Sequence, residues 1–152
     1  MSNCSNGDFK TPYGTITVRN PGRFTDPPNL QTYKRPEGDV QLQGPALRSF
    51  KEAEVAATPR RLRRKGKVLP ILITGVGFRS YKVQADYYNS PANVDGRYAD
   101  PDCSMHCEAL AVDIDMTQGA LRRARIARQL KKRGWHYAVD GEPWHASFRL
   151  AG

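Results

Sequence analysis

The chain has 152 residues, of which 39% are hydrophobic and 26% are charged, which suits one folded domain with its own core and excludes wholesale disorder. No run approaches the roughly 18 apolar residues that cross a bilayer, and the N-terminus lacks a basic start and an apolar stretch, so we expect neither a membrane span nor a signal peptide. Lys and Arg number 24 against 15 Asp and Glu, and the resulting charge of +9 favours a polyanionic partner. Candidate partners are nucleic acid, anionic lipid and the acidic polymers of a bacterial wall.

The N-terminal segment, residues 1–44, is rich in Pro, Gly, Asn and Thr. We predict that it is an irregular arm covering a domain of residues 45–152. Within the arm only residues 14–19 alternate in the way that a short strand does.

The domain is predicted to begin with a helix over residues 46–57, because Pro45 suits the first helical turn. The basic run of residues 60–67 has two interpretations, a solvated loop or a nucleic-acid-binding arm, and it lacks the aromatic residues that base stacking uses. Residues 69–77 are apolar and β-branched, which predicts a buried strand.

Three further elements are predicted in the middle of the chain. Residues 81–88 form a short helix, and residues 110–116 alternate strictly as a strand does. Residues 117–133 form an amphipathic helix with Leu121, Ile126 and Leu130 facing inward.

The chain is predicted to end in two strands, near residues 135–139 and 144–150, joined by a short turn and therefore antiparallel. We expect Trp135 and Trp144 to be core residues rather than platforms for sugars. The fold class is therefore α+β, with a small, largely antiparallel sheet and packed helices.

Two of the three histidines lie near carboxylates in the sequence. His106 stands seven residues before Asp113, and Glu142 stands three residues before His145. Two imidazoles and one carboxylate can form a three-ligand catalytic zinc site, and the second carboxylate can serve as the base for the zinc-bound water. The alternative is that these are ordinary core and surface residues.

The surrounding residues resemble known signatures. Ser104-Met-His-Cys-Glu-Ala-Leu-Ala-Val-Asp113 resembles Ser-x-His-x-x-Gly-x-Ala-x-Asp, and Glu142-Pro-Trp-His145 resembles Glu-x-Trp-His. Upstream, Gly77-Phe-Arg-Ser-Tyr-Lys-Val-Gln84 is similar to Gly-Tyr-Arg-Ser-x-x-x-Gln. In this order, over about residues 40–150, the patterns resemble those of the zinc D-alanyl-D-alanine peptidase family, which includes vancomycin-resistance-type carboxypeptidases and phage endolysins.

The resemblance implies a hedgehog/DD-peptidase-like fold and a site with one zinc ion. Its ligands would be His106, Asp113 and His145, with Glu142 as the catalytic base. Arg79 would be the cation that steadies the scissile carbonyl and would also contact substrate.

Substrate contacts are further implied for Ser104, Gln84 and Tyr88. Two family glycines are replaced here, by Asp102 and by Ala109. The second replacement is mild unless the backbone there needs a positive φ.

The activity implied is hydrolysis of peptidoglycan stem peptides, by a D-Ala-D-Ala carboxypeptidase or an L-Ala-D-Glu-type endopeptidase such as a phage endolysin. We expect a monomer with no nucleic-acid partner, which reaches the wall from the host cytoplasm or is carried on a virion, and which is attracted by anionic wall polymers. The alternative is a non-catalytic, basic wall- or nucleic-acid-binding module on the same fold. A structural zinc site built on Cys103, His106 and Cys107 would lack a fourth ligand, because the only remaining cysteine is Cys4.

Overall fold

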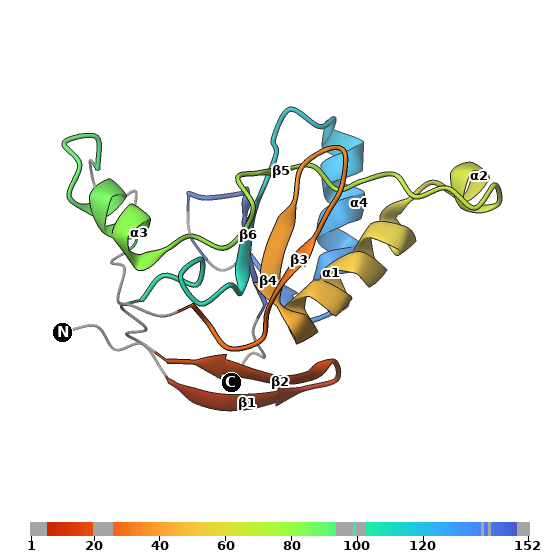
Figure 1. The fold of residues 1–152 in the computed structure, drawn as a ribbon. Coiled ribbons are helices and arrows are strands. Elements are labelled where there is room, and N and C mark those ends of the chain that lie inside the picture. Colours follow the sequence, from red (N-terminus) through yellow and green to blue (C-terminus); the bar gives the residue numbers. More distant parts are fainter. Residues whose placement is uncertain are drawn as a thin grey trace.

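The computed structural model describes residues 6–19, 26–93, 99, 103–137, 139 and 141–148, which form short strands and helices (Figure 1). The helices in these residues are α1 (Gly44–Ala57), α2 (Arg60–Arg63), α3 (Tyr81–Tyr88) and α4 (Ala120–Lys131). The strands are β1 (Gly7–Thr11), β2 (Gly14–Val18), β3 (Leu30–Tyr33), β4 (Val40–Gln43), β5 (Ile73–Thr74), β6 (Ala111–Ile114), β7 (Trp135–His136) and β8 (His145–Phe148). The predicted α+β class with small antiparallel sheets is confirmed.

The largest sheet has the order β5-β6-β8-β7, and each neighbouring pair is antiparallel. The predicted pairing of the two last strands is confirmed, since Trp135 lies opposite Phe148. β6 lies inside the sheet and pairs with β8 so that Asp113 faces His145 across the ladder. This register places a carboxylate and an imidazole side by side on one face.

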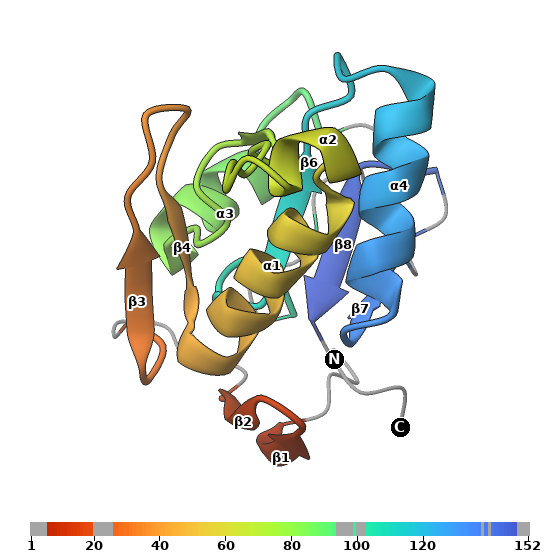
Figure 2. The ribbon, with the colours of Figure 1, turned by 90° about the vertical axis from the view of Figure 1, so that its right-hand side faces the viewer.

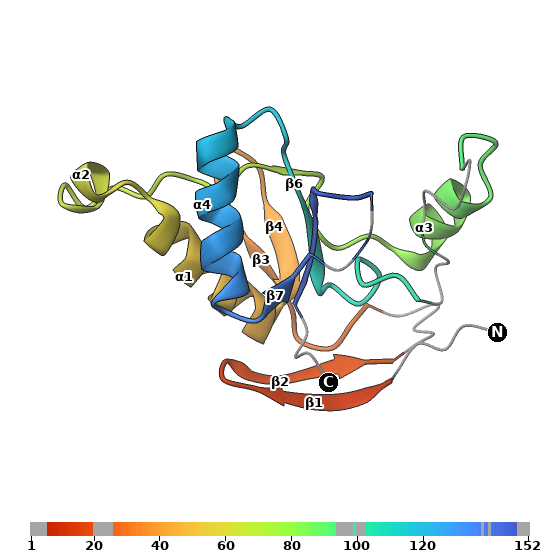
Figure 3. The same cartoon turned by 180° about the vertical axis from the view of Figure 1, so that it is seen from behind.

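Helices α1 and α4 lie against each other and cover one face of this sheet (Figure 2). α3 lies on the other side of β6 (Figures 1 and 3). Phe50 of α1, Ile126 of α4 and Val112 of β6 are fully buried in the core between helices and sheet. Trp135 joins this core and donates its indole N–H to Ser49 Oγ at 3.0 Å, so its assignment as a core residue is correct. None of the described helices has the length and apolar character needed to cross a bilayer.

Two β-hairpins, β1–β2 and β3–β4, lie in the segment for which only one strand was predicted. Ile16 and Leu42 of these hairpins are fully buried in the same core as α1. The strands have four or five residues each, too few for a clear alternation of burial in the sequence. Whether residues 45–152 fold without this segment stays a prediction.

The apolar residues 69–77 form a strand only at β5, and the longer predicted strand is wrong. Side chains take the backbone groups that a sheet would otherwise pair. Glu54 accepts a hydrogen bond from Ile71 N, and Gln118 bonds both N and O of Leu72. The segment is therefore extended and well bonded without being a strand.

α4 is shorter than the predicted helix of residues 117–133, and Leu121, which was predicted to face inward, is exposed. The Asp115 carboxylate accepts hydrogen bonds from the amide and hydroxyl of Thr117, so the chain forms a turn before the helix begins. Leu121 is 86% exposed, whereas Ile126 is buried. Five residues at 3.6 per turn place these two side chains about 140° apart around the helix, so they cannot share a face.

Candidate metal centre

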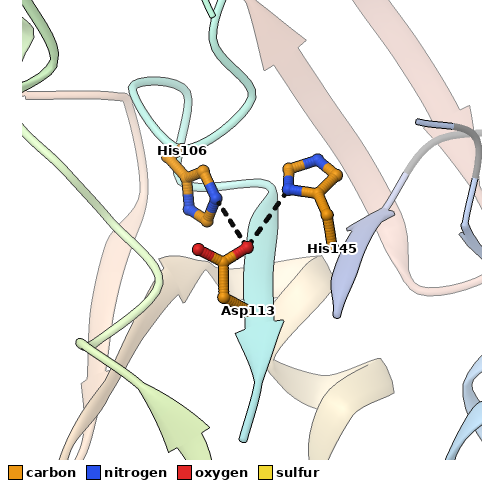
Figure 4. A group of neighbouring side chains, drawn as sticks. All are labelled: His106, Asp113 and His145. Atoms are coloured by element: carbon orange, nitrogen blue, oxygen red, sulfur yellow. Dashed lines mark hydrogen bonds and ion pairs between the residues drawn. The ribbon is translucent and has the colours of Figure 1, made fainter. Parts of the chain in front are cut away.

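Three potential metal ligands converge at the pairing of β6 and β8 (Figure 4). Asp113 projects from β6, His145 begins β8, and His106 lies in the turn that leads into β6. Asp113 Oδ1 lies 3.2 Å from His106 Nε2 and 3.2 Å from His145 Nδ1. A tetrahedral zinc ion about 2.0–2.2 Å from each ligand atom holds those atoms roughly 3.4 Å apart, which is close to the observed spacing.

The second ring nitrogen of each histidine is fixed by a neighbour. His106 Nδ1 donates to the carbonyl oxygen of Gly77 at 2.8 Å, because a carbonyl can only accept. His145 Nε2 lies 2.9 Å from Ser147 Oγ. In the neutral ring His106 Nε2 then carries no proton and faces a carboxylate oxygen, so a cation between them is favoured. This donor set fits zinc, which takes imidazole nitrogen and carboxylate oxygen.

The electrostatics of Asp113 favour its charged form. Burial alone would raise the pKa of this carboxyl, but the hydrogen bonds and positive charges that His106 and His145 supply when their rings carry both protons together outweigh burial and hold the pKa below its usual range. Arg79 adds a positive charge, with Nη2 3.6 Å from Asp113 Oδ2. The third ligand is therefore a carboxylate at neutral pH.

Gly77 supplies the carbonyl oxygen that orients His106, and its backbone conformation explains the glycine. Its φ is +93°, and a Cβ there would lie 3.1 Å from Gln41 O and 3.2 Å from Ala111 O. The peptides before and after Gly77 both bond to Gln41 of β4, because Gln41 N donates to Val76 O and Phe78 N donates to Gln41 O. The carbonyl is therefore held by the β3–β4 hairpin.

Arg79 and Gln84 form a bonded pair beside the ligands. Arg79 Nη1 donates to Gln84 Oε1 at 2.7 Å, and Gln84 Nε2 donates to the carbonyl oxygen of Ala99 at 2.7 Å. The Arg79 guanidinium also lies 5.1 Å from the centre of the Tyr87 ring. These contacts fix the guanidinium at the wall of the site rather than leaving it in solvent.

A cavity of about 580 Å³ opens over the three ligands. Arg79, Gln84, Ser104 and Glu142 all line it, so the structure brings these predicted residues together with the ligands. Tyr88 is 42% exposed and is not among the lining residues.

Sequence reasoning missed three contributors to this site. They are Gly77 and Ser147, which bond the histidine rings, and Trp144, which was wrongly expected in the core and instead is half-buried and lines the cavity. Ser147 has a sequence signal, since residues two apart on a strand share a face and it follows His145 by two. The contact from Gly77 has none, because it joins segments 29 residues apart.

Of the two replaced family glycines, Asp102 lies outside the described residues, and Ala109 can be compared with the expectation. Ala109 has a φ of +55°, so the backbone does take the left-handed conformation at the position where the family has glycine. Cys107 is a buried free thiol whose sulfur lies 3.8 Å from Ser80 O, and burial raises its pKa to about 11. Cys103 is disulfide-bonded, so neither cysteine belongs to the ligand cluster found among the described residues.

No protein-family model matches the chain, and no curated protein matches it in sequence. Among solved structures, DacB from Streptococcus pneumoniae D39 is similar, with a TM-score of 0.52 and 20% identity over 97% of this chain and 83% of DacB. The LdcB LD-carboxypeptidase, whose structure concerns peptidoglycan recognition, gives a TM-score of 0.48 and 20% identity over 100% of this chain and 84% of LdcB. The likeness to DacB shows that the chain has the fold expected from the family resemblance.

Proposed function

We propose that the protein is a mononuclear zinc peptidase that hydrolyses stem peptides of bacterial peptidoglycan. The observation that carries this proposal is the cluster of His106, Asp113 and His145 at a cavity that also holds Glu142 and Arg79. Three ligands of this kind leave a fourth position for water, the arrangement of catalytic rather than structural zinc. The sequence resemblance supplies the substrate class.

A zinc ion at these ligands would lower the pKa of a bound water from 15.7 to about 7. Glu142 accepts the proton of the attacking water and later donates it to the leaving amine, as a general base and then a general acid. Arg79 stabilises the negative charge that develops on the substrate carbonyl oxygen, and its bond to Gln84 keeps it in position before substrate arrives. Asp113 and the two histidines would hold the metal.

Ser104 is the candidate contact for a substrate carboxylate, since it lines the same cavity and lies two residues before His106. A cavity of about 580 Å³ suits a short peptide rather than a folded protein chain. Both a terminal D-Ala-D-Ala bond and an internal L-Ala-D-Glu bond fit this description. Action as a phage endolysin, released from the host cytoplasm or carried on a virion, rests on the resemblance.

The test combines metal analysis with mass analysis of digested peptidoglycan. We expect one zinc per chain and product masses that identify a single cleaved peptide bond. Replacement of His106 by Ala should abolish zinc binding, and full zinc occupancy in His106→Ala would contradict the ligand assignment. A zinc-loaded, folded wild-type protein that cleaves no stem peptide would support the non-catalytic binding module instead.

Glu142→Gln tests the mechanism separately from the metal site. The amide keeps the shape of the side chain but cannot accept a proton, so zinc content and folding should stay near wild type while turnover falls about 10²–10⁴-fold. Glu37→Gln is the matched control, because Glu37 is exposed and lies outside the cavity. Near-normal hydrolysis by zinc-loaded Glu142→Gln would refute the role of Glu142 as base.

A further inference from the structure

A second cavity, of about 620 Å³, lies between α2 and α4. We call it the arginine groove, after the side chains that line it: Arg60, Arg61 and Arg63 of α2, and Arg125 and Arg128 of α4. Figures 1 and 3 show α2 and α3 at opposite ends of the molecule with β6 between them. Because the metal centre lies on the α3 side of β6, a ligand in the groove leaves that centre open.

The charges of the arginine groove have no counter-ion among the described residues. All five guanidinium-bearing residues are exposed, and no Asp or Glu of the described chain lines the cavity. The glutamates of α1 are already paired with other arginines: Glu52 pairs with Arg133, and Glu54 pairs with Arg35. Five like charges in one concave surface repel one another and attract anions.

These arginines repel one another, and hydrogen bonds of neighbouring residues keep the two helices that carry them side by side. Arg122 of α4 donates to the carbonyl oxygens of Ala57 at 2.6 Å and Leu69 at 2.8 Å, which flank α2 on either side. Thr58 Oγ1 accepts a hydrogen bond from Leu69 N at 2.9 Å, which closes the base of the α2 segment. Burial and the positive charge of Arg125 lower the pKa of Arg122. The residues that flank α2 are thus fixed against α4, and this places the arginines of α2 beside those of α4.

We propose that the arginine groove binds the phosphodiester groups of a linear polymer that carries no bases. Guanidinium groups pair with phosphate through two parallel hydrogen bonds, which makes arginine better suited than lysine to this ligand. The lining contains no Phe, Tyr or Trp, and single-stranded nucleic acids are held largely by stacking on such residues. The observations therefore favour a sugar- or polyol-phosphate chain over single-stranded nucleic acid.

The biological source of the polymer rests on the proposed function, since a wall phosphate polymer would keep a peptidase next to its substrate. The binding itself does not rest on that function. Each phosphate neutralised releases counter-ions and adds about 0.7–0.9 to the slope of log affinity against log salt. If all five arginines are engaged, the slope should be roughly −3.5 to −4.5.

The experiment titrates the 152-residue protein into fluorescently labelled poly(glycerol phosphate) free of stem peptides, followed by anisotropy between about 50 and about 200 mM salt. Two variants remove two charges each, Arg61→Gln/Arg63→Gln on α2 and Arg125→Gln/Arg128→Gln on α4. The control Lys10→Gln/Lys34→Gln removes the same charge from exposed positions elsewhere. Each groove variant should lose at least about tenfold in affinity and about 1.4–1.8 in salt slope, about 0.7–0.9 per contact, while the control keeps both.

Several outcomes would overturn the proposal. Equal losses in the control and the groove variants would mean that only net charge matters. Equal or tighter binding of single-stranded or duplex DNA at the same salt would identify a nucleic-acid surface, and equal binding of poly-γ-glutamate would exclude selectivity for phosphate. Since the polymer contains no peptide to cleave, loss of the peptidase proposal would not alter the result, and failure to bind would leave the peptidase proposal intact.

Discussion

A buried ion pair between Arg35 and Glu54 supports the scaffold beneath the metal centre. The two side chains are 3% and 2% exposed, and Arg35 Nη1 lies 2.7 Å from Glu54 Oε2. Tyr33 OH donates to the other carboxylate oxygen, and Ile71 N donates to Oε2. Arg35 also donates to the carbonyl oxygens of Gly38 and Ile71. Without Glu54, the Tyr33 hydroxyl, the Ile71 amide and the Arg35 guanidinium would each lose a hydrogen-bond partner.

Replacing Glu54 with Ala should lower the free energy of unfolding by about 3–5 kcal/mol, because the Arg35 charge would remain buried without a counter-ion. Glu54→Gln keeps one acceptor oxygen and the side-chain volume, so it should lose about 1.5–3 kcal/mol, the worth of hydrogen bonds to a charged group. For a chain of this length each kcal/mol lowers the melting temperature by about 2–4 °C, so Glu54→Ala should melt about 6–20 °C lower.

Urea unfolding followed by circular dichroism measures the loss, with EDTA present so that metal binding does not add to stability. The dependence on urea should keep its slope, since the variants expose the same surface on unfolding. Glu37→Gln, at an exposed position, should stay within about 0.5 kcal/mol of wild type. A loss below about 1 kcal/mol in Glu54→Ala would refute the reasoning from an uncompensated buried charge.

Three further predictions concern the residues around the metal ligands. Ala109→Val places a branched side chain at a buried position with a φ of +55°, so urea unfolding should show a loss of about 1–3 kcal/mol, and an unchanged stability would contradict the left-handed backbone. Burial raises the pKa of Cys107 to about 11, so iodoacetamide at pH 8 should modify it only after unfolding in guanidinium; rapid alkylation of the native protein would contradict this. Burial alone would raise the pKa of Asp113, but its hydrogen bonds to both histidines hold the pKa below the unfolded value of about 3.9. The stabilising contribution of the Asp113 carboxylate is therefore present above that value and lost as pH falls below it. Zinc-free Asp113→Asn should consequently lose less stability than wild type between pH 5 and 3. Identical profiles of stability against pH would contradict the lowered pKa.

The three candidate ligands were named from the family resemblance, and local pattern supports two of them. Strict alternation over residues 110–116 placed Asp113 on the less apolar face of a strand, and His145 begins the strand that pairs with it. The sequence did not predict that β6 pairs with β8, and it is this antiparallel pairing, with Asp113 opposite His145, that brings the two side chains together. The approach of His106 came only from the resemblance, because it depends on a turn whose shape the sequence alone does not reveal.

Helices were more predictable than strands in this chain, except that α2 lies in the basic run of residues 60–67, which was interpreted as a loop or an arm and not as a helix. Ser80 marks the start of α3 because its hydroxyl accepts a hydrogen bond from Val83 N, and the observed helix matches the predicted residues 81–88. Residues 69–77 were mistaken for a strand because apolar, β-branched composition indicates burial without saying which groups bond the backbone. Here side chains from α1 and from Gln118 take those groups, and neither contact is visible in the local sequence.

The β3–β4 hairpin, which lies in the segment predicted to be an irregular arm, contacts the backbone that orients one of the candidate metal ligands. Gln41 of β4 bonds the peptides on both sides of Gly77, and this fixes the direction of the Gly77 carbonyl. That carbonyl accepts the Nδ1 proton of His106, which leaves Nε2 as the atom facing Asp113. A histidine ligand needs its second ring nitrogen held in this way to keep the correct tautomer and ring orientation. A domain that began at residue 45 would lack the backbone groups of Gln41. The β3–β4 hairpin therefore supports the candidate metal centre, as do the strands that carry its candidate ligands.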